Sequence, residues 1–402
     1  MLNLNDSFRR LSAPGTNRSA IQLTQGERFC YPLYYYIPTL TADDRYLVYH
    51  EASGGQIQLH CLDLRSGEDR QLTHANAADT WWRPWCINSG SGVLDHRSVL
   101  NRKSGEVIYF DGADGNSVNA VHVPSGKTRH LFDLPKDRMA IGQNCITPDG
   151  GQFIYIQADR ATYLALFPEP PDWRHYWPHR NTCRGTRLMA YDLDSGAQRM
   201  ILAIDSPIHH VFPYDDNRLL FCHPTAENGL LMTDLRGGWY THLRTQDERG
   251  GKICHFVATK RGIPYEVLER PDGIWSGLCD PDRRQFYEFL LPRTFGYTHT
   301  GLDPEGLLWF YENQHGPQAD RPAAHDLHFL QRHNPGGEDH WLALTGDWPT
   351  YGGGQKSHFH PQVVLNRQHI LMTAGDERTR TNHIYLLDIA DLTPTQGIRL
   401  PA

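Results

Sequence analysis

The hydrophobic and polar positions of this chain follow the two-residue alternation of β-strands through most of its 402 residues. Short runs rich in Val, Ile, Leu, Tyr and Phe are separated by Gly- and Asp-rich turns, as in the succession 36–49, 58–67 and 70–73. Signals for helices are almost absent. The pattern therefore predicts an all-β protein.

The same succession of strands and tight turns recurs along the chain. Turns of the Asp-Leu-x-Ser-Gly type occur at 63–67 and 192–196, and other turns precede hydrophobic strands at 303–306 and 365–368. Seven such units, at a period of about 40 to 60 residues, predict a seven-bladed β-propeller with four-stranded blades. Because radially packed blades share one continuous core, we expect residues 1–402 to form a single domain.

Two segments fall outside this repeat. The stretch 18–25 resembles an outer strand without its own blade, so we expect this N-terminal strand to complete the last blade and close the ring. Residues 1–17 are then an N-terminal arm. The segment 167–180 is too aromatic and too rich in proline for a strand, and we predict a loop over one face.

Composition narrows the classes of function. Lys and Arg number 39 against 46 Asp and Glu, and the net charge of -7 argues against a general nucleic-acid binder or a membrane-surface binder. The start of the chain shows no secretory signal, and no apolar run approaches membrane-spanning length. The eight cysteines are widely spaced, and we expect reduced thiols in a cytosolic protein, mostly buried on strands.

Histidine is unusually frequent, at 23 residues, and one pair is notable for its surroundings. His358 and His360 are two apart, so on a strand they would point the same way. The glycines at 352–354 favour a loop that could swing Gln355 back toward both imidazoles. An amide oxygen with two imidazoles suits Mn, Fe, Ni or Zn, although ordinary polar surface is the alternative interpretation of such a pair.

Other histidines fall at equivalent places in neighbouring units, where the first strand begins, at intervals of about 45 residues. Four neighbouring units would therefore bring imidazoles to one mouth of the central channel. Three of these with Gln355 would leave coordination positions open, which is a catalytic arrangement. His255 or His210 would remain as an imidazole able to act as a base near neutral pH. The histidines concerned are His209, His210, His255, His299, His358 and His360.

Through these residues the chain resembles the oligogalacturonate lyase family. The resemblance extends over nearly the whole chain, and its most specific part is a Q-x-x-H-x-H segment with an upstream histidine at the start of a blade. The residues that carry it are Gln355-x-x-His358-x-His360-Pro361, Thr298-His299 before Asp303-Pro304-Glu305-Gly306, Cys254-His255, and Pro213-Tyr214-Asp215-Asp216 followed by Phe221-Cys222-His223.

The resemblance implies a cytoplasmic seven-bladed propeller that cleaves short pectin-derived oligouronides by β-elimination. A divalent metal would bind the uronate carboxylate, and His255 would remove the C5 proton as the catalytic base. Manganese is the expected ion, with Zn, Ni or Fe as alternatives. The partner is an acidic oligosaccharide, with no nucleic acid and no membrane, and the protein would be a monomer or homodimer. The implied metal ligands are His299, Gln355, His358 and His360.

The chain departs from the family where an arginine is expected beside the base. The family places it in the strand after a Cys-His-Glu-Gly turn, but here the turn reads Cys222-His223-Pro224-Thr225 and the strand at 228–231 has no arginine. Arg236, Arg180 or Arg184 would have to supply that charge, or else the substrate differs from oligogalacturonate.

Further side chains are candidates for binding substrate. Arg83, within Trp81-Trp82-Arg83-Pro84-Trp85, could pair with a carboxylate, and Tyr35, within 34–36, could stack on a sugar ring. Packing between blades is the alternative for these aromatic residues. The substrate-binding candidates are Arg83, Arg180, Arg184, His209, His223 and Tyr35.

Other functions stay open at this point. A lyase for another uronate polymer such as ulvan, or a metal-assisted isomerase, would use the same C–H abstraction. A non-catalytic propeller that binds a peptide or protein, as TolB-like and WD-type propellers do, would share the fold, which does not separate these functions. The converging histidines favour catalysis, because a protein-binding rim does not need them.

Overall fold

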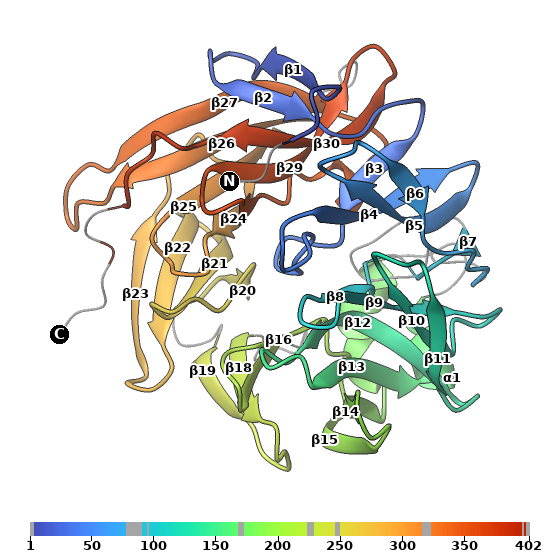
Figure 1. Cartoon of the computed structure of the whole chain (residues 1–402). Coiled ribbons are helices and arrows are strands. Elements are labelled where there is room, and N and C mark those ends of the chain that lie inside the picture. The colour runs from blue at the N-terminus through green and yellow to red at the C-terminus, as the bar shows by residue number, and fades with distance from the viewer. Residues whose placement is uncertain are drawn as a thin grey trace. The chain divides into compact units, whose positions relative to one another are not determined.

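The computed structural model describes residues 4–77, 91–94, 96–167, 173–222, 229–245, 250–315, 323–395 and 398. Strands dominate these residues, as the alternation predicted (Figure 1). The chain divides into two compact units. Unit 1 comprises residues 1–36, 63–68 and 250–402, and unit 2 comprises 37–62 and 69–249. The single domain and the count of seven blades stay predictions.

Unit 1 is built from antiparallel sheets whose strands mostly follow one another in the chain. One sheet consists of β20 (Lys252–Cys254), β21 (Ile263–Arg270), β22 (Gly273–Asp280) and β23 (Gln285–Leu290). The next consists of β24 (Tyr297–Leu302), β25 (Trp309–His315), β26 (Ala323–Arg332) and β27 (His340–Thr350). A third has the order β1 (Arg9–Ser12), β2 (Ser19–Gln22), β30 (Thr381–Asp388), β29 (His369–Asp376) and β28 (Gln362–Val364), with β3 (Phe29–Pro32) against β29 and β30.

The N-terminal strand pairs with the last strand of the chain. β2 lies antiparallel to β30, with Ala20 opposite Leu387, so the prediction that this strand completes the last sheet is confirmed. Figure 1 shows blue β2 beside red β30. The preceding residues form more than an arm, because β1 pairs with β2 and Leu11 packs against the core of unit 1. This sheet therefore has five strands where four were expected.

Unit 2 contains the remaining sheets. β5 (Gln56–Asp63) lies between β4 (Tyr46–Ser53) and β6 (Asp69–Gln71), with β7 (Ser91–Gly92) also paired to β5. The next sheet is β8 (Val99–Asn101), β9 (Glu106–Asp111), β10 (Ser117–His122) and β11 (Thr128–Asp133). A parallel pair between Gln143 and His210 joins two groups of four strands. They are β12 (Arg138–Ile146), β13 (Gln152–Asp159), β14 (Thr186–Asp192) and β15 (Gln198–Ile204), then β16 (His210–Pro213), β17 (Arg218–Cys222), β18 (Gly229–Asp234) and β19 (Thr241–Thr245).

The recurrent Asp-Leu-x-Ser-Gly turns close strand pairs by the same local bonds. In one turn Asp63 Oδ1 accepts the backbone N–H of Arg65 and Ser66, and Gly67 has φ 76°. In another, Asp192 Oδ1 accepts the backbone N–H of Ser195. An aspartate that caps its own turn, followed by a glycine in the left-handed region, explains why this pattern marks hairpins.

The aromatic insertion was predicted as a loop, and that prediction is wrong for its described part. α2 (Trp173–His179) and the 3₁₀ helix η1 (Arg180–Thr182) occupy it, and α1 (Arg160–Leu164) precedes it. Tyr176 is fully buried and its ring stacks on Phe167 at 5.1 Å. This burial stabilises a helical turn even though Pro178 lies inside it and lacks an N–H donor.

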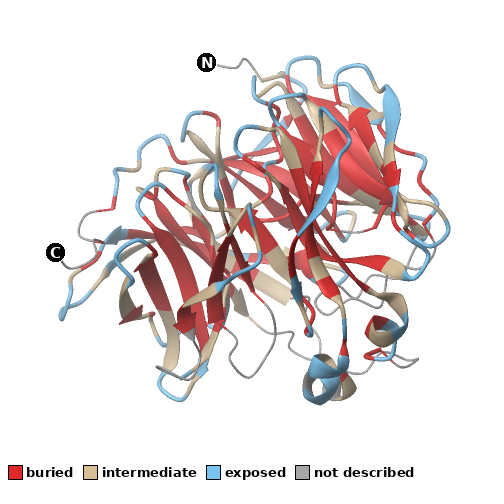
Figure 2. Cartoon of the chain, turned by 90° about the horizontal axis from the view of Figure 1, so that it is seen from below, coloured by how far each residue is buried: buried red, intermediate tan, exposed pale blue. Residues whose placement is uncertain are grey.

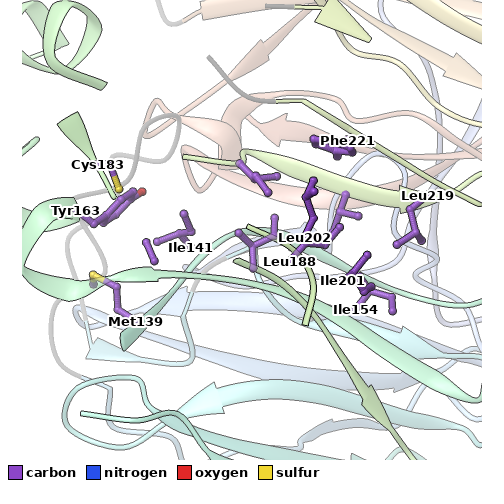
Figure 3. Close-up of a cluster of buried hydrophobic side chains, with 14 of the residues drawn as sticks. Met139, Ile141, Ile154, Tyr163, Cys183, Leu188, Ile201, Leu202, Leu219 and Phe221 are labelled. Carbon is purple, nitrogen blue, oxygen red and sulfur yellow. The ribbon is translucent and has the colours of Figure 1, made fainter. Parts of the chain in front are cut away.

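Buried apolar residues form the core of each unit. Figure 2 shows that the buried residues lie mainly on the strands and that many connecting turns are exposed. Figure 3 shows such a cluster in unit 2, where Ile154 and Leu188 of one four-strand group meet Leu219 and Phe221 of the other. Burying each of these side chains contributes about 1.5–3 kcal/mol. In unit 1 a comparable cluster joins Phe310 and Leu327 to Phe359 and Ile370.

The described cysteines are all free, and all are buried except the half-buried Cys254. Six lie on strands and Cys183 follows η1, which confirms the expectation for these residues, while Cys86 lies outside the described residues. Within the described residues no helix has the length and apolarity needed to cross a membrane. The cytoplasmic location stays a prediction.

Candidate functional site

The glycine triplet places Gln355 beside a histidine. Gly352, Gly353 and Gly354 have φ of 77°, 61° and 66°, values that favour glycine because it lacks a Cβ. A single 3₁₀ turn, η2 (Gln355–Ser357), follows and reverses the chain. Gln355 Oε1 consequently lies 2.9 Å from His360 Nε2, the return toward the imidazoles that the glycines suggested.

Three imidazoles converge at this turn. His299 lies in β24, and its ring centre is 4.7 Å from that of His358 and 5.0 Å from that of His360. The last two rings lie 5.6 Å apart and nearly parallel, at 14°. Phe359 between them is fully buried, and its carbonyl accepts the N–H of Thr373 in β29. The core of unit 1 thus fixes both histidines.

These distances fit a single transition-metal ion. Imidazole nitrogens bind such ions at about 2.0–2.1 Å, so ring centres around one ion at right or tetrahedral angles lie about 4.5–5.3 Å apart. Two of the three measured separations, 4.7 and 5.0 Å, fall in that range, and the third, 5.6 Å, is slightly longer. An amide oxygen and an imidazole nitrogen at adjacent positions would lie about 3 Å apart, close to the 2.9 Å between Gln355 and His360.

A buried carboxylate that the sequence reasoning missed holds this cluster together. Glu312 of β25 lies opposite His299 and is fully buried. Its oxygens lie 3.2 Å from Nδ1 of His299, 3.5 Å from Nδ1 of His358 and 2.6 Å from Nδ1 of His325. They also accept the backbone N–H of Phe359, at 2.8 Å, and of the residue after it. A carboxylate at Nδ1 leaves Nε2 of His299 and His358 for a metal.

The protonation states suit metal binding. Burial lowers the pKa of His299 well below its usual value, and the neighbouring His255 and His358 add to that effect. Burial raises the pKa of Glu312, but the nearby imidazoles of His299, His325 and His358 outweigh burial and hold that pKa well below its usual value. At neutral pH His299 is therefore an uncharged ligand and Glu312 is ionised, as a metal site requires.

The candidate base lies next to this cluster. His255 directly follows β20, and its ring centre is 4.1 Å from that of His299. Its Nδ1 lies 2.9 Å from Oε2 of Glu266, a fully buried residue of β21 whose other oxygen accepts the hydroxyl of Thr300. A proton on Nδ1 that faces a carboxylate leaves the lone pair on Nε2, the tautomer a base needs.

Two of the site histidines have an unusual backbone. His255 and His360 both have φ 47°, in the left-handed region that non-glycine residues seldom adopt. Strain of this kind costs on the order of 1–3 kcal/mol and is found where a side chain must be aimed. Both residues lie in the cluster, which supports a functional role for it.

Tyr35 also lies among the candidate residues. Its ring centre is 5.7 Å from that of His299 and 6.1 Å from those of His255 and His360. The hydroxyl donates to the carbonyl of Phe256 at 3.5 Å. The side chain is 6% exposed, so packing accounts for most of its surface.

The remaining predicted residues lie in unit 2 or outside the described residues. His210 opens β16, and His209 Nε2 is 2.6 Å from the hydroxyl of Tyr176 in α2. Arg180 lies in η1, and Arg184 is exposed beside Asp205 at 3.4 Å. Arg83 and His223 lie outside the described residues. Unit 1 thus gathers His255, His299, Gln355, His358, His360 and Tyr35.

The two glutamates had a signal in the sequence. Glu266 stands within Pro264-Tyr265-Glu266-Val267 and Glu312 within Trp309-Phe310-Tyr311-Glu312. A carboxylate in the middle of an apolar strand is seldom buried unless it has partners. The apolar neighbours therefore indicated that both glutamates have partners, but they did not identify the partner of either.

Comparison with known proteins finds relatives in the family that the site residues resemble. No family model matches the chain. A curated oligogalacturonate lyase from Dickeya dadantii is 22% identical over 222 residues, 55% of this chain. The matched segment spans about half the length of that relative, 52%.

Solved structures resemble the chain over nearly its whole length. An oligogalacturonate lyase in complex with manganese superposes with a TM-score of 0.75 at 19% identity, covering 96% of this chain and 97% of that one. An oligogalacturonate lyase from Vibrio parahaemolyticus gives 0.75 at 16% identity, with the same coverage. The chain has the fold of these proteins and resembles oligogalacturonate lyases in sequence.

Proposed function

We propose that the protein is a metal-dependent lyase that cleaves short uronate-containing oligosaccharides, of the oligogalacturonide type, by β-elimination. The observation that carries this proposal is the convergence in unit 1 of three imidazoles and the oxygen of Gln355, next to His255 and its carboxylate partner Glu266. The resemblance to oligogalacturonate lyases supports the substrate class.

The metal would be manganese, with Zn, Ni or Fe as alternatives. When bound, a divalent ion supplies positive charge that stabilises the anion formed as the proton beside a uronate carboxylate leaves. An imidazole or an amide that binds a metal carries no charge of its own, so the four proposed ligands would not cancel that of the ion. The proposed ligands are His299, Gln355, His358 and His360.

His255 would take the C5 proton of the substrate on Nε2. Glu266 accepts a hydrogen bond from Nδ1–H and so fixes the ring, and the same carboxylate stabilises the imidazolium that forms. As the C5–H bond breaks, a double bond forms between C4 and C5, and the bond from C4 to the bridging oxygen breaks. That oxygen leaves with the remaining chain and takes a proton from water, and the His255 imidazolium returns its proton to solvent.

Further proposals concern the fold, the location, the partner and the oligomeric state. We propose seven blades closed by the N-terminal strand, a cytoplasmic location, an acidic oligosaccharide as partner and a monomer or homodimer. His210 is proposed as the alternative base. The residues proposed to contact substrate are Tyr35, His209, Arg180, Arg184, Arg83 and His223. β18 carries no arginine in Gly229–Asp234, which favours a uronide other than oligogalacturonate, such as an ulvan fragment, as a second candidate substrate.

The test is turnover of a panel of uronides by the purified protein with Mn²⁺. The 4,5-unsaturated product absorbs in the ultraviolet, and we expect its signal with metal and its loss after chelation. Elemental analysis of protein purified without a His-tag checks the metal independently of substrate. No product from any uronide, with or without metal, would favour the protein-binding propeller instead.

A further inference from the structure

We propose that Cys254, His255 and Glu266 form a second metal site, suited to a thiophilic cation such as Zn²⁺, and that filling this site inactivates the base. The existence of the site is independent of the proposed function. Only its effect on turnover rests on that function.

The three side chains come together through the start of one sheet. Cys254 ends β20 directly opposite Glu266 of β21, and His255 follows with φ 47°. Because of this backbone turn, adjacent side chains do not point to opposite faces, and Cys254 Sγ lies 3.7 Å from His255 Nδ1. One ligand atom from each of the three residues lies within 4.8 Å of the other two.

The spacing is close to that of a tetrahedral zinc site. With Zn–S of about 2.3 Å and Zn–N or Zn–O of about 2.0–2.2 Å, sulfur and nitrogen lie about 3.5 Å apart and nitrogen and oxygen about 3.3 Å apart. The distances of 3.7 Å from Cys254 Sγ to His255 Nδ1 and 2.9 Å from that nitrogen to Glu266 Oε2 differ from these by a few tenths of an ångström. A solvent molecule would complete the coordination.

Ligand chemistry separates this site from the one proposed for manganese. A thiolate is soft and favours zinc or cadmium, whereas imidazole with amide oxygen accepts manganese. Cys254 is also the one described cysteine that is half-exposed. Burial raises the pKa of the Cys279 thiol to about 12, which makes that cysteine a poor ligand and a suitable control.

Occupation changes the tautomer of the base. A neutral imidazole carries one proton, which on His255 lies on Nδ1 while that atom faces Glu266. A cation on Nδ1 takes that lone pair, so the remaining proton must reside on Nε2, and the thiol proton of Cys254 is released to solvent. Nε2–H cannot accept the C5 proton of a substrate. The thiolate and the carboxylate together offset the two charges of the zinc ion.

The first experiment reads the site without any turnover. Cd²⁺ or Co²⁺ is added to the Mn²⁺-loaded protein, and thiolate-to-metal charge-transfer absorption is recorded. We expect the band for the wild type and for Cys279→Ser, and its loss in Cys254→Ser. No band in the wild type, or an equal band in Cys254→Ser, would overturn the site, and neither result depends on lyase activity.

The second experiment reads the consequence. Zn²⁺ is titrated into turnover assays that contain Mn²⁺. We expect Cys254→Ser to turn over normally without zinc and to need at least about tenfold more zinc for half inhibition, because even an outer-shell partner of a metal contributes about 10–100-fold in affinity. Zinc that merely replaced manganese would change the turnover of both proteins to the same extent. That result, or a thiolate band without inhibition, would overturn the link to the base.

Discussion

The two neighbouring sheets β20–β23 and β24–β27 place a buried glutamate at the same position for different purposes. In each, the second strand presents the glutamate opposite the end or middle of the first strand: Glu266 faces Cys254 and Glu312 faces His299. Glu266 contacts the imidazole of His255 and the hydroxyl of Thr300. Glu312 contacts three imidazoles and two backbone N–H groups.

The difference shows how one strand position serves two kinds of chemistry. A carboxylate bonded to Nδ1 of His255, as Glu266 is, orients that ring and stabilises its charge, which suits a base that gains a proton. A carboxylate with several partners ties β24 to the segment of His358 and His360 and sets the tautomer of His299 and His358, which suits a metal site. Glu312 also keeps its negative charge outside the proposed ligand set.

Removing the imidazole of His255 or of His299 should give the largest effects. The two variants should differ in whether turnover alone or metal binding is lost. We expect His255→Ala to lower turnover by about 10²–10⁴-fold, the usual contribution of a general base, while Mn²⁺ binding persists. His299→Ala should instead lose Mn²⁺. Calorimetric metal titration and uronide turnover measure both. Loss of metal in His255→Ala would mean that the base is misassigned.

The two glutamates should differ in metal affinity. Glu312→Gln removes the charge and one of the two acceptor oxygens that orient the ligands, so we expect Mn²⁺ affinity to fall by about 10–100-fold. Glu266→Gln is the matched variant, at the same strand position, and should bind Mn²⁺ as the wild type does. Electron paramagnetic resonance of free Mn²⁺ measures both constants, and equal losses in the two variants would remove the distinction.

Glu266→Gln should instead alter catalysis. The amide can still accept from Nδ1 but no longer stabilises an imidazolium, so we expect kcat to fall by about tenfold or more with KM little changed. Glu266→Asp should recover part of that loss, whereas a purely structural role would show as a lower melting temperature in both variants. An unchanged kcat in Glu266→Gln would contradict the assignment of His255 as its partner in catalysis.

The smallest effect is expected at Tyr35, which lies near histidines from both sheets. Its bond to the carbonyl of Phe256 is long, at 3.5 Å, so Tyr35→Phe should cost less than about 1 kcal/mol of stability and change Mn²⁺ affinity little. Denaturant unfolding and metal titration measure these quantities. A rise in KM for Tyr35→Ala but not for Tyr35→Phe would indicate that the ring contacts substrate.

Local spacing allowed part of this site to be predicted. The glycines at 352–354 and the two-residue step between His358 and His360 are short-range features, and the structure shows Gln355 beside His360 as they suggested. The histidines at the first strands were found because the repeat aligned them. Glu312 was missed because its contacts depend on strand register and on a segment far along the chain.

In the fold, too, local features could be predicted and elements that depend on distant contacts could not. Alternation and turn chemistry were sufficient for the sheets and for the pairing of β2 with β30. β1 was missed because its sequence, Arg9–Ser12, has little apolar character, and its pairing depends on β2 already being in place. α2 was missed because its stability comes from burying Tyr176 in unit 2, a tertiary contact that overrides weak helix propensity.

The most direct test of the metal site is a crystal structure of the Mn²⁺-loaded protein with anomalous scattering measured for manganese. We predict one strong peak within about 2.0–2.3 Å of imidazole nitrogens of His299, His358 and His360 and of Gln355 Oε1, with Glu312 outside the coordination shell. A peak bound through Glu312 in place of Gln355, or no peak among these residues, would contradict the account.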